Sequence, residues 1–76
     1  MKVLIHADGA SRGNPGQAAI GATIEDSGGR LLASVSQRIG MATNNQAEYR
    51  AVIAALKEAL KLGAAGVDVY LDRYFI

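Results

Sequence analysis

The sequence predicts an α/β fold in which one helix covers one face of a mixed four-stranded sheet, in the order βββαβ. Two observations support this prediction. Short apolar and β-branched runs separated by glycine-rich turns are typical of strands, and one long stretch without glycine or proline is typical of a helix. A last apolar run follows the helix. A right-handed crossover would let this run lie parallel to a central strand.

Four strands are expected, over residues 2–7, 18–26, 31–39 and 67–71. Asp8 and Asp72 come at the ends of the first and the last of them. The first three strands form an antiparallel meander because their connections are short. Pro15-Gly16 suits the two central positions of a type II turn, and residues 27–30 signal a tight hairpin. Alternation along the third strand places Leu32, Ser34, Ser36 and Arg38 on one face.

The helix is expected to begin after Thr43 and to end near Gly63. Thr43 is a favourable N-cap, and Gln46 has the spacing of a capping box. Gly63 suits the left-handed residue that closes a helix. The larger apolar residues follow helical spacing and are expected to face the core: Tyr49, Val52, Ile53, Leu56, Ala59 and Leu60. The opposite side carries Arg50, Lys57, Glu58 and Lys61.

The composition limits the chain to a small protein without covalent staples. With 76 residues it is expected to form one domain, residues 1–76, and with no cysteine it has neither disulfides nor thiolate metal sites. The net charge of +1 argues against nucleic-acid binding driven by bulk charge. No stretch approaches the ~18 apolar residues of a membrane span, and the N-terminal apolar run is too short for a signal peptide. The cytoplasm is the expected location.

The predicted sheet has more apolar surface than one helix can cover. The first strand carries Val3 and Ile5 on one face and Leu4 on the other. The last strand carries Val67, Val69 and Leu71 on one face and Tyr70 on the other. Strands that are apolar on both faces are normally buried on both sides. A further layer is therefore expected, most simply another copy of the chain, which predicts a homo-oligomer formed through the uncovered sheet face.

Three carboxylates are expected to converge at one edge of the sheet. Asp8 and Asp72 end strands that would be parallel neighbours, and Glu48 lies in the first turn of the helix. Ligands of open α/β sheets gather at the carboxyl ends of parallel strands. Like charges at 4 Å repel by about 4 kcal/mol at an effective dielectric near 20, so such a cluster requires a cation or retained protons. Oxygen ligands without His or Cys favour Mg²⁺ or Mn²⁺, which are typical of phosphoryl-transfer sites.

Each of these residues also has an ordinary structural interpretation. Glu48 could be a solvated residue of the first helical turn, Asp8-Gly9 a turn, and Asp72 a solvated strand end, since acidic side chains are mostly exposed. His6 is interpreted as a strand residue, because nothing spaced for metal binding accompanies it. The glycine-rich loop is no P-loop, since no Lys-Ser/Thr follows, and it remains either a binding loop or a plain connection.

Three segments together resemble the signatures of type I ribonuclease H. They are residues 8–16 (DGASRGNPG), residues 43–49 (TNNQAEY) and residues 70–72 (YLD), in the family's order and with plausible spacing. The resemblance spans nearly the whole chain. Because the family's domain is longer, the resemblance implies a truncated ribonuclease H-like fold in which the first strand is central and pairs with the last.

The resemblance also implies a site and a substrate. Asp8, Glu48 and Asp72 would be catalytic metal ligands for Mg²⁺ or Mn²⁺, and the RNA strand of an RNA/DNA hybrid would be hydrolysed. Contacts to the hybrid in its minor groove would come from Gly9, Ser11, Gly13, Asn14, Asn44 and Asn45. Amide groups and carbonyls can recognise the 2′-OH that distinguishes RNA from DNA. Two other functions stay open: a catalytically inert, self-associating half-domain, and a module that binds nucleic acid without cutting it.

Overall fold

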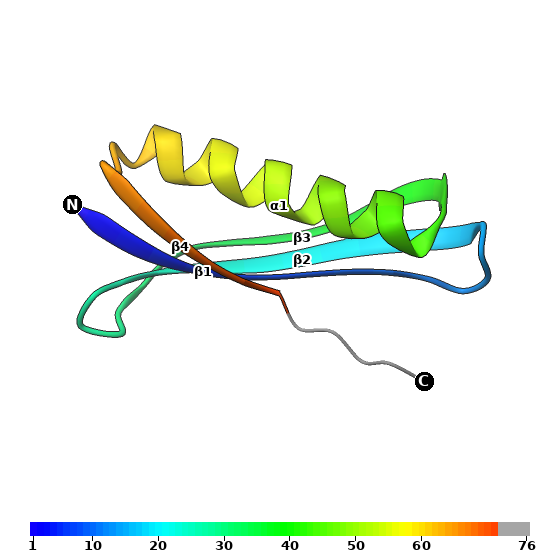
Figure 1. Ribbon diagram of the computed structural model, residues 1–76, viewed down its shortest axis with the longest axis horizontal. Helices are drawn as coiled ribbons and strands as arrows, with labels where there is room; N and C mark the ends of the chain where they lie inside the picture. Colours follow the sequence, from blue (N-terminus) through cyan, green and yellow to red (C-terminus); the bar gives the residue numbers. More distant parts are fainter. Residues whose placement is uncertain (72–76) are drawn as a thin grey trace.

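The strands and the helix occur in the predicted order βββαβ. In the computed structural model, which describes residues 1–71, α1 lies across one face of a four-stranded sheet (Figure 1). The elements are β1 (Lys2–Ser11), β2 (Gly16–Asp26), β3 (Leu31–Ala42), α1 (Asn44–Lys61) and β4 (Gly66–Leu71). Among residues 1–71, no helix has the length of apolar sequence that crossing a membrane requires.

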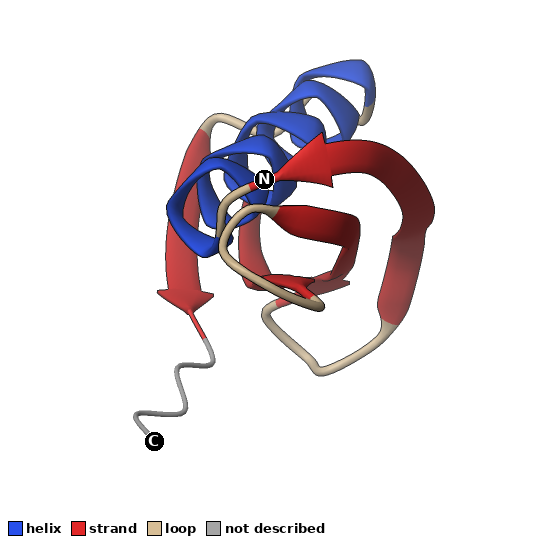
Figure 2. Ribbon diagram, turned by 90° about the vertical axis from the view of Figure 1, so that its right-hand side faces the viewer, coloured by secondary structure: helices blue, strands red, loops and turns tan. Residues whose placement is uncertain are grey.

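The sheet has the strand order β3-β2-β1-β4, which places β1 in the interior beside β4 as predicted. β1 is antiparallel to β2 and parallel to β4, and β2 is antiparallel to β3. The parallel register runs to Ala7 opposite Leu71, and on the other side of β1 Asp8 lies opposite Gly21. Figure 2 shows the sheet strongly curled below the helix. The mixed α/β fold predicted from the sequence is confirmed.

The first three strands are longer than predicted. β1 continues through Asp8 to Ser11, so the prediction that Asp8 ends the strand is wrong. Asp and Gly have low strand propensity, but pairing of this segment with residues 18–21 of β2 overrides that preference. The predicted type II turn is also wrong. Gly16 does not have the positive φ that such a turn requires; it pairs with Ala42, and the Asn14–Pro15 peptide bond is cis.

The hairpin between β2 and β3 is confirmed. Gly29 has a φ of +86°, which favours glycine, and its N–H donates to the Asp26 carbonyl at 3.0 Å. The Asp26 side chain also stabilises the turn through hydrogen bonds, which the glycine-rich sequence of the turn did not predict. Its Oδ1 accepts from the N–H groups of Gly28 and Arg30, each at 2.9 Å, and this arrangement closes the turn.

The predicted helix start and stop are confirmed. The Gln46 N–H donates to Thr43 Oγ1 at 3.1 Å, and the Thr43 N–H donates to Gln46 Oε1 at 2.9 Å, which completes the capping box. At the other end, Gly63 has a φ of +75°, and its N–H donates to the Leu60 carbonyl. The capping box fixes where α1 begins. The first turn of α1 carries no acidic residue, so the prediction that Glu48 lies in it is wrong; Glu48 comes just after that turn.

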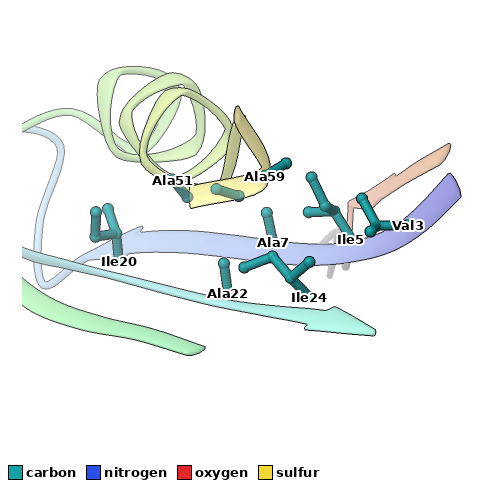
Figure 3. Close-up of a cluster of buried hydrophobic side chains, with 9 residues drawn as sticks. Val3, Ile5, Ala7, Ile20, Ala22, Ile24, Ala51 and Ala59 are labelled. Atoms are coloured by element: carbon teal, nitrogen blue, oxygen red, sulfur yellow. The ribbon is translucent and has the colours of Figure 1, made fainter. Parts of the chain in front are cut away.

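The core lies between α1 and the central strands (Figure 3). From the sheet, its largest fully buried side chains are Val3, Ile5 and Ile24. From the helix, every fully buried residue is an alanine: Ala47, Ala51, Ala55 and Ala59. These four follow i, i+4 spacing, and we call them the alanine stripe. Because its members are small, the helix backbone can approach the sheet closely.

The helix therefore does not use the predicted apolar stripe to face the sheet. Only Ala59 of that set is fully buried, whereas Tyr49 and Leu60 are 72% and 75% exposed. At 3.6 residues per turn, these two lie on nearly the opposite side of α1 from the alanine stripe. The physical reason is size, because large side chains on the inner side would hold the helix too far from β1 at Gly9.

The exposed apolar side chains gather beside the helix. α1 packs on β1 and β2, and it leaves the helix side of β4 open. A groove lies there, lined by Tyr49, Val52, Ile53, Val69 and Leu71, with Asn45 and Glu48 at one end. We call it the apolar groove. It lies on the same side of the sheet as α1.

The sheet face away from α1, which we call the open face, is mainly polar. Along β3 it carries Ser34, Ser36 and Arg38, as alternation predicts. Leu32 does not join them, because the register shifts between Ile24 and Glu25 and Leu32 packs against the core. The predicted homo-oligomer stays a prediction, and the apolar groove is a more apolar candidate surface than the open face.

Candidate active site

Asp8 lies on the exposed side of β1, and its neighbours Ala7 and Gly9 point into the protein. Its carboxylate therefore faces the open side of the sheet. Two residues earlier on the same side, His6 stacks on Tyr70 of β4, with ring centroids 5.5 Å apart and an interplanar angle of 23°. His6 is thus half-buried against an aromatic ring, in agreement with its interpretation as a strand residue.

Gly9 brings β1 into backbone contact with the first turn of α1. A Cβ on Gly9 would lie 2.2 Å from the Ala47 carbonyl oxygen and 2.6 Å from the Glu48 nitrogen. No side chain fits in that space, so glycine is required for the close approach. The consequence is that the backbone of Glu48 lies directly against the residue that follows Asp8. The structure thereby brings the backbones of two of the three predicted carboxylate residues close together, while the Asp8 side chain faces the open side of the sheet and Glu48 lines the apolar groove.

Glu48 is half-buried at the end of the apolar groove, beside Asn45 and Leu71. It lines this groove together with Leu71, the last described residue of β4. This position differs from that of a fully solvated surface glutamate, because apolar side chains of α1 and β4 line the same groove.

The third predicted carboxylate, Asp72, lies outside the described residues. Within residues 1–71, no three His, Cys, Asp or Glu side chains are grouped as a metal site requires. The donor set that Asp8 and Glu48 offer consists of carboxylate oxygens alone, which suits a hard divalent ion such as Mg²⁺ or Mn²⁺. Two carboxylates of this kind fit a divalent ion that keeps several of its waters.

The glycine-rich loop and the helix start are joined by hydrogen bonds. The Ser11 N–H donates to Asn44 Oδ1 at 2.9 Å, and the Asn44 N–H donates to Asn14 Oδ1 at 3.0 Å. The Ser11 hydroxyl also contacts Asn44 Oδ1 and donates to the Gly13 carbonyl. The loop of residues 12–15 is thus held against the N-terminus of α1 by contacts about thirty residues apart in sequence. We call this set the asparagine cluster.

The asparagine cluster orients its two side-chain amides. A backbone N–H can only donate, so each Oδ1 that accepts from one is identified as the oxygen of its amide. The Nδ2 groups of Asn14 and Asn44 are then left as hydrogen-bond donors. Donors of this kind can contact hydroxyl and phosphate oxygens of a nucleic acid. The arrangement can therefore bind a polar, anionic ligand beside the two carboxylates.

Asn45, which was predicted at the site, and Gly16, which was not, lie outside the asparagine cluster. Asn45 lines the apolar groove with Glu48 and has no hydrogen bond to the asparagine cluster. Gly16, which the sequence offered only as a turn residue, packs backbone to backbone on the loop, since a Cβ there would lie 2.8 Å from the Gly13 nitrogen. The steric requirement at Gly9 was missed because it depends on a contact distant in sequence, with Ala47 and Glu48, whereas the one at Gly16 depends on how the loop folds back on Arg12 and Gly13.

Comparisons with known proteins agree with this fold. A family model described as "Reverse transcriptase-like" matches residues 6–76. The bifunctional protein Rv2228c of Mycobacterium tuberculosis is 53% identical over 73 residues, which is 95% of this chain and 20% of that protein. Its solved N-terminal RNase H domain has a TM-score of 0.92 at 51% identity, and the match covers 96% of this chain and 56% of that one.

Two further ribonucleases H are similar. Ribonuclease HI of Halobacterium salinarum is 46% identical over 99% of this chain and 38% of its own length. The solved complex of LC11-RNase H1 with an RNA/DNA hybrid has a TM-score of 0.86 at 41% identity, over 93% of this chain and 54% of that one.

Fold, register and sequence identity together define a ribonuclease H-like unit. The chain belongs to the reverse transcriptase-like family, among relatives that are ribonucleases H. It spans about half the length of the solved domains it matches and a fifth of Rv2228c.

Proposed function

We propose that this chain acts in the metal-dependent hydrolysis of the RNA strand of RNA/DNA hybrids. The observation that carries the proposal is the close approach of Gly9 to Ala47, by which the backbone of Glu48 lies against the residue that follows Asp8. The asparagine cluster joins the adjoining loop to the start of α1. The relatives support it, since they are ribonucleases H and one of them was solved with a hybrid. We also propose residues 1–76 as one ribonuclease H-like unit, and the cytoplasm stays the predicted location.

Asp8, Glu48 and Asp72 would hold the ion, which we propose to be Mg²⁺ or Mn²⁺. When bound, such an ion supplies Lewis-acid polarisation of the phosphoryl oxygens and lowers the pKa of bound water. The protein's own contribution is position. Gly9 permits the close approach of β1 to α1 at Ala47 and Glu48, and the capping box of Thr43 fixes where α1 begins. We propose that this framework positions Asp8 and Glu48 for the ion.

Substrate recognition is proposed for the asparagine cluster. The Nδ2 donors of Asn14 and Asn44 are aimed away from the protein backbone that fixes their oxygens. A wide minor groove displays 2′-hydroxyls and base-edge acceptors to such donors. Gly9, Ser11, Gly13 and Asn45 complete the proposed contact set, in which Ser11 and Gly13 shape the loop and Asn45 lies beside Glu48.

The test is cleavage of a labelled RNA/DNA hybrid by the 76-residue chain in Mg²⁺ and in Mn²⁺. We expect cleavage that EDTA abolishes and that Asp8→Asn reduces by at least about 100-fold, since loss even of outer-shell partners of a metal site costs about 10- to 100-fold. The matched control is Asp68→Asn, which removes a carboxylate that pairs with Lys2 and should keep full activity.

The catalytic proposal would be refuted if the folded wild-type chain did not cleave the hybrid in either metal, or if Asp8→Asn cleaved as well as wild type. Folding is checked for each variant by circular dichroism. A metal-only readout is also available, because Mn²⁺ broadens NMR signals near its site. Broadening is expected at residues 8–9 and 47–48 and should vanish in Asp8→Asn.

A second candidate function is self-association, which the apolar groove favours. Tyr49 and Ile53 of α1 are 72% and 51% exposed, and Val69 and Leu71 of β4 are 39% and 42% exposed. Contiguous apolar surface of this kind is typical of an interaction site. A second copy would cover it and could give an inert, oligomeric half-domain. Sedimentation equilibrium of wild type and of Ile53→Ser tests this, with Ser34→Ala on the open face as the control. A wild-type monomer at all concentrations would refute it.

A further inference from the structure

A second groove lies on the open face, away from the apolar groove. It has a volume of about 620 Å³ and is lined by Ala10, Ser11, Arg12, Gln17, Ala18, Ala19 and Arg38. Arg12 comes from the loop after β1 and Arg38 from β3, so residues far apart in sequence form one surface. We call it the arginine groove.

The floor of the arginine groove is made of small residues. Ala10 of β1 lies opposite Ala19 of β2, and Ala19 lies opposite Arg38 of β3, which forms one row across the sheet. Arg12 comes two residues after Ala10, and its backbone N–H donates to the Gln17 carbonyl at 2.9 Å. Ala10 and Ala19 line the groove together with Arg12 and Arg38, and their small side chains leave space for a ligand in it.

The charge of the groove is positive and uncompensated within residues 1–71. No acidic residue lines it, and the ion pairs in this part of the chain are Lys2–Asp68 and Lys61–Glu58. Arg12 and Arg38 are both exposed, with no carboxylate partner among the described residues. Guanidinium groups match phosphate geometry and bind it bidentately.

We infer that the arginine groove binds a phosphodiester group of a nucleic-acid strand. This inference rests on the proposed function for the identity of the strand, an RNA/DNA hybrid. Asp8 and Ala10 lie on the same side of β1, two residues and about 7 Å apart along the strand. A backbone phosphate held between Arg12 and Arg38 would therefore anchor the strand a short distance from the carboxylates. The net charge of +1 does not oppose this, because the contact is local.

The experiment measures binding of a fluorescent RNA/DNA hybrid by anisotropy as a function of salt, in EDTA so that no cleavage occurs. Each phosphate contact contributes about 0.7 to 0.9 to the slope of log K against log[salt]. The double variant Arg12→Gln/Arg38→Gln is expected to lower the magnitude of the slope by about 0.7 to 0.9, because the groove holds one phosphate, and each single variant by less than the double variant. Arg30→Gln is the matched control, because Arg30 lies at the other end of β2, about 30 Å away, and should leave the slope unchanged.

A second probe separates this inference from the proposed function. A single-stranded DNA oligonucleotide offers phosphodiesters without RNA, and the double variant should lower its salt slope as well. If the chain binds DNA with a salt slope that the double variant lowers, but cleaves no hybrid, the proposed catalysis is refuted and phosphodiester binding by the arginine groove is supported. If the chain cleaves the hybrid and the double variant keeps the full salt slope, phosphodiester binding by the groove is refuted and the proposed catalysis is supported. Wild-type chain that binds neither probe would overturn the groove.

The position of the phosphate is tested directly by NMR. Titration of inorganic phosphate into ¹⁵N-labelled chain is expected to shift the amide signals of Ala10, Arg12, Ala19 and Arg38. In the double variant these shifts should disappear. Shifts confined to other residues, or unchanged in the double variant, would contradict the assignment of the site to this groove.

Discussion

Replacing Gly9 by alanine should destabilise the fold and damage the site together. The added Cβ would lie 2.2 Å from the Ala47 carbonyl oxygen, whereas ordinary contact begins near 3.4 Å, so β1 and α1 must separate by about 1 Å. Overpacking of this kind typically costs about 1–3 kcal/mol, and both neighbours here are backbone atoms that cannot rotate away. We expect a loss of about 2–3 kcal/mol. For a domain of this size, 1 kcal/mol corresponds to about 4–8 °C, so the melting temperature should fall by about 10–20 °C.

The assay is thermal unfolding followed by circular dichroism, with Gly21→Ala as the matched control. Gly21 also lies in an interior strand, but a Cβ there would meet nothing closer than the Val35 carbonyl at 3.7 Å. Gly21→Ala should therefore unfold at or slightly above the wild-type temperature. A Gly9→Ala variant that melts within about 2 °C of wild type would refute the close approach, and with it the reason for placing Glu48 beside Asp8.

Three further changes test the helix and the hairpin by the same assay. Thr43→Ala removes the capping box and should cost about 1 kcal/mol, whereas Thr43→Ser should keep most of it, and equal losses in both would contradict the role of the hydroxyl. Ala55→Leu on the alanine stripe should lower the free energy of unfolding by about 1–3 kcal/mol, because it overpacks the core. Leu60→Ala on the exposed side should lower it by less than about 0.5 kcal/mol. If Leu60→Ala cost more than Ala55→Leu, α1 would face the sheet with its large residues. Asp26→Ala should cost about 1 kcal/mol or more, because the Gly28 and Arg30 N–H groups lose their acceptor, and an unchanged melting temperature would be evidence against that role.

Local signals predicted the elements and their order correctly. The capping box at Thr43 and the left-handed Gly63 depend on residues close in sequence, and both are confirmed. The crossover predicted that β4 lies parallel to a central strand, and the resemblance to ribonuclease H identified that strand as β1, which is confirmed. What failed depends on contacts across the chain. β1 extends past Asp8 because β2 pairs with it, and nothing in the local sequence specifies that partner.

The side of the helix that faces the sheet was mispredicted because hydrophobic patterns weight large residues. Tyr49 and Ile53 give a stronger apolar signal than alanines do, yet alanines are what the sheet requires. The distance between helix and sheet is limited by the contact of Gly9 with Ala47, and only small side chains fit at that distance. A sequence cannot reveal this requirement until the strand that carries the glycine is known to lie below the helix.

The two apolar sides of α1 have different consequences for the molecule. The alanine stripe permits the close approach of α1 to β1, in which the backbone of Ala47 and Glu48 lies against Gly9, so this approach limits the side chains of the stripe to small ones. The exposed side, with Tyr49 and Leu60, lies away from that contact and is apolar enough to be buried against a further layer, since a helix apolar on more than one side is typical of a buried position. Changes on the exposed side should therefore alter association with that layer while the separation of β1 and α1 stays fixed.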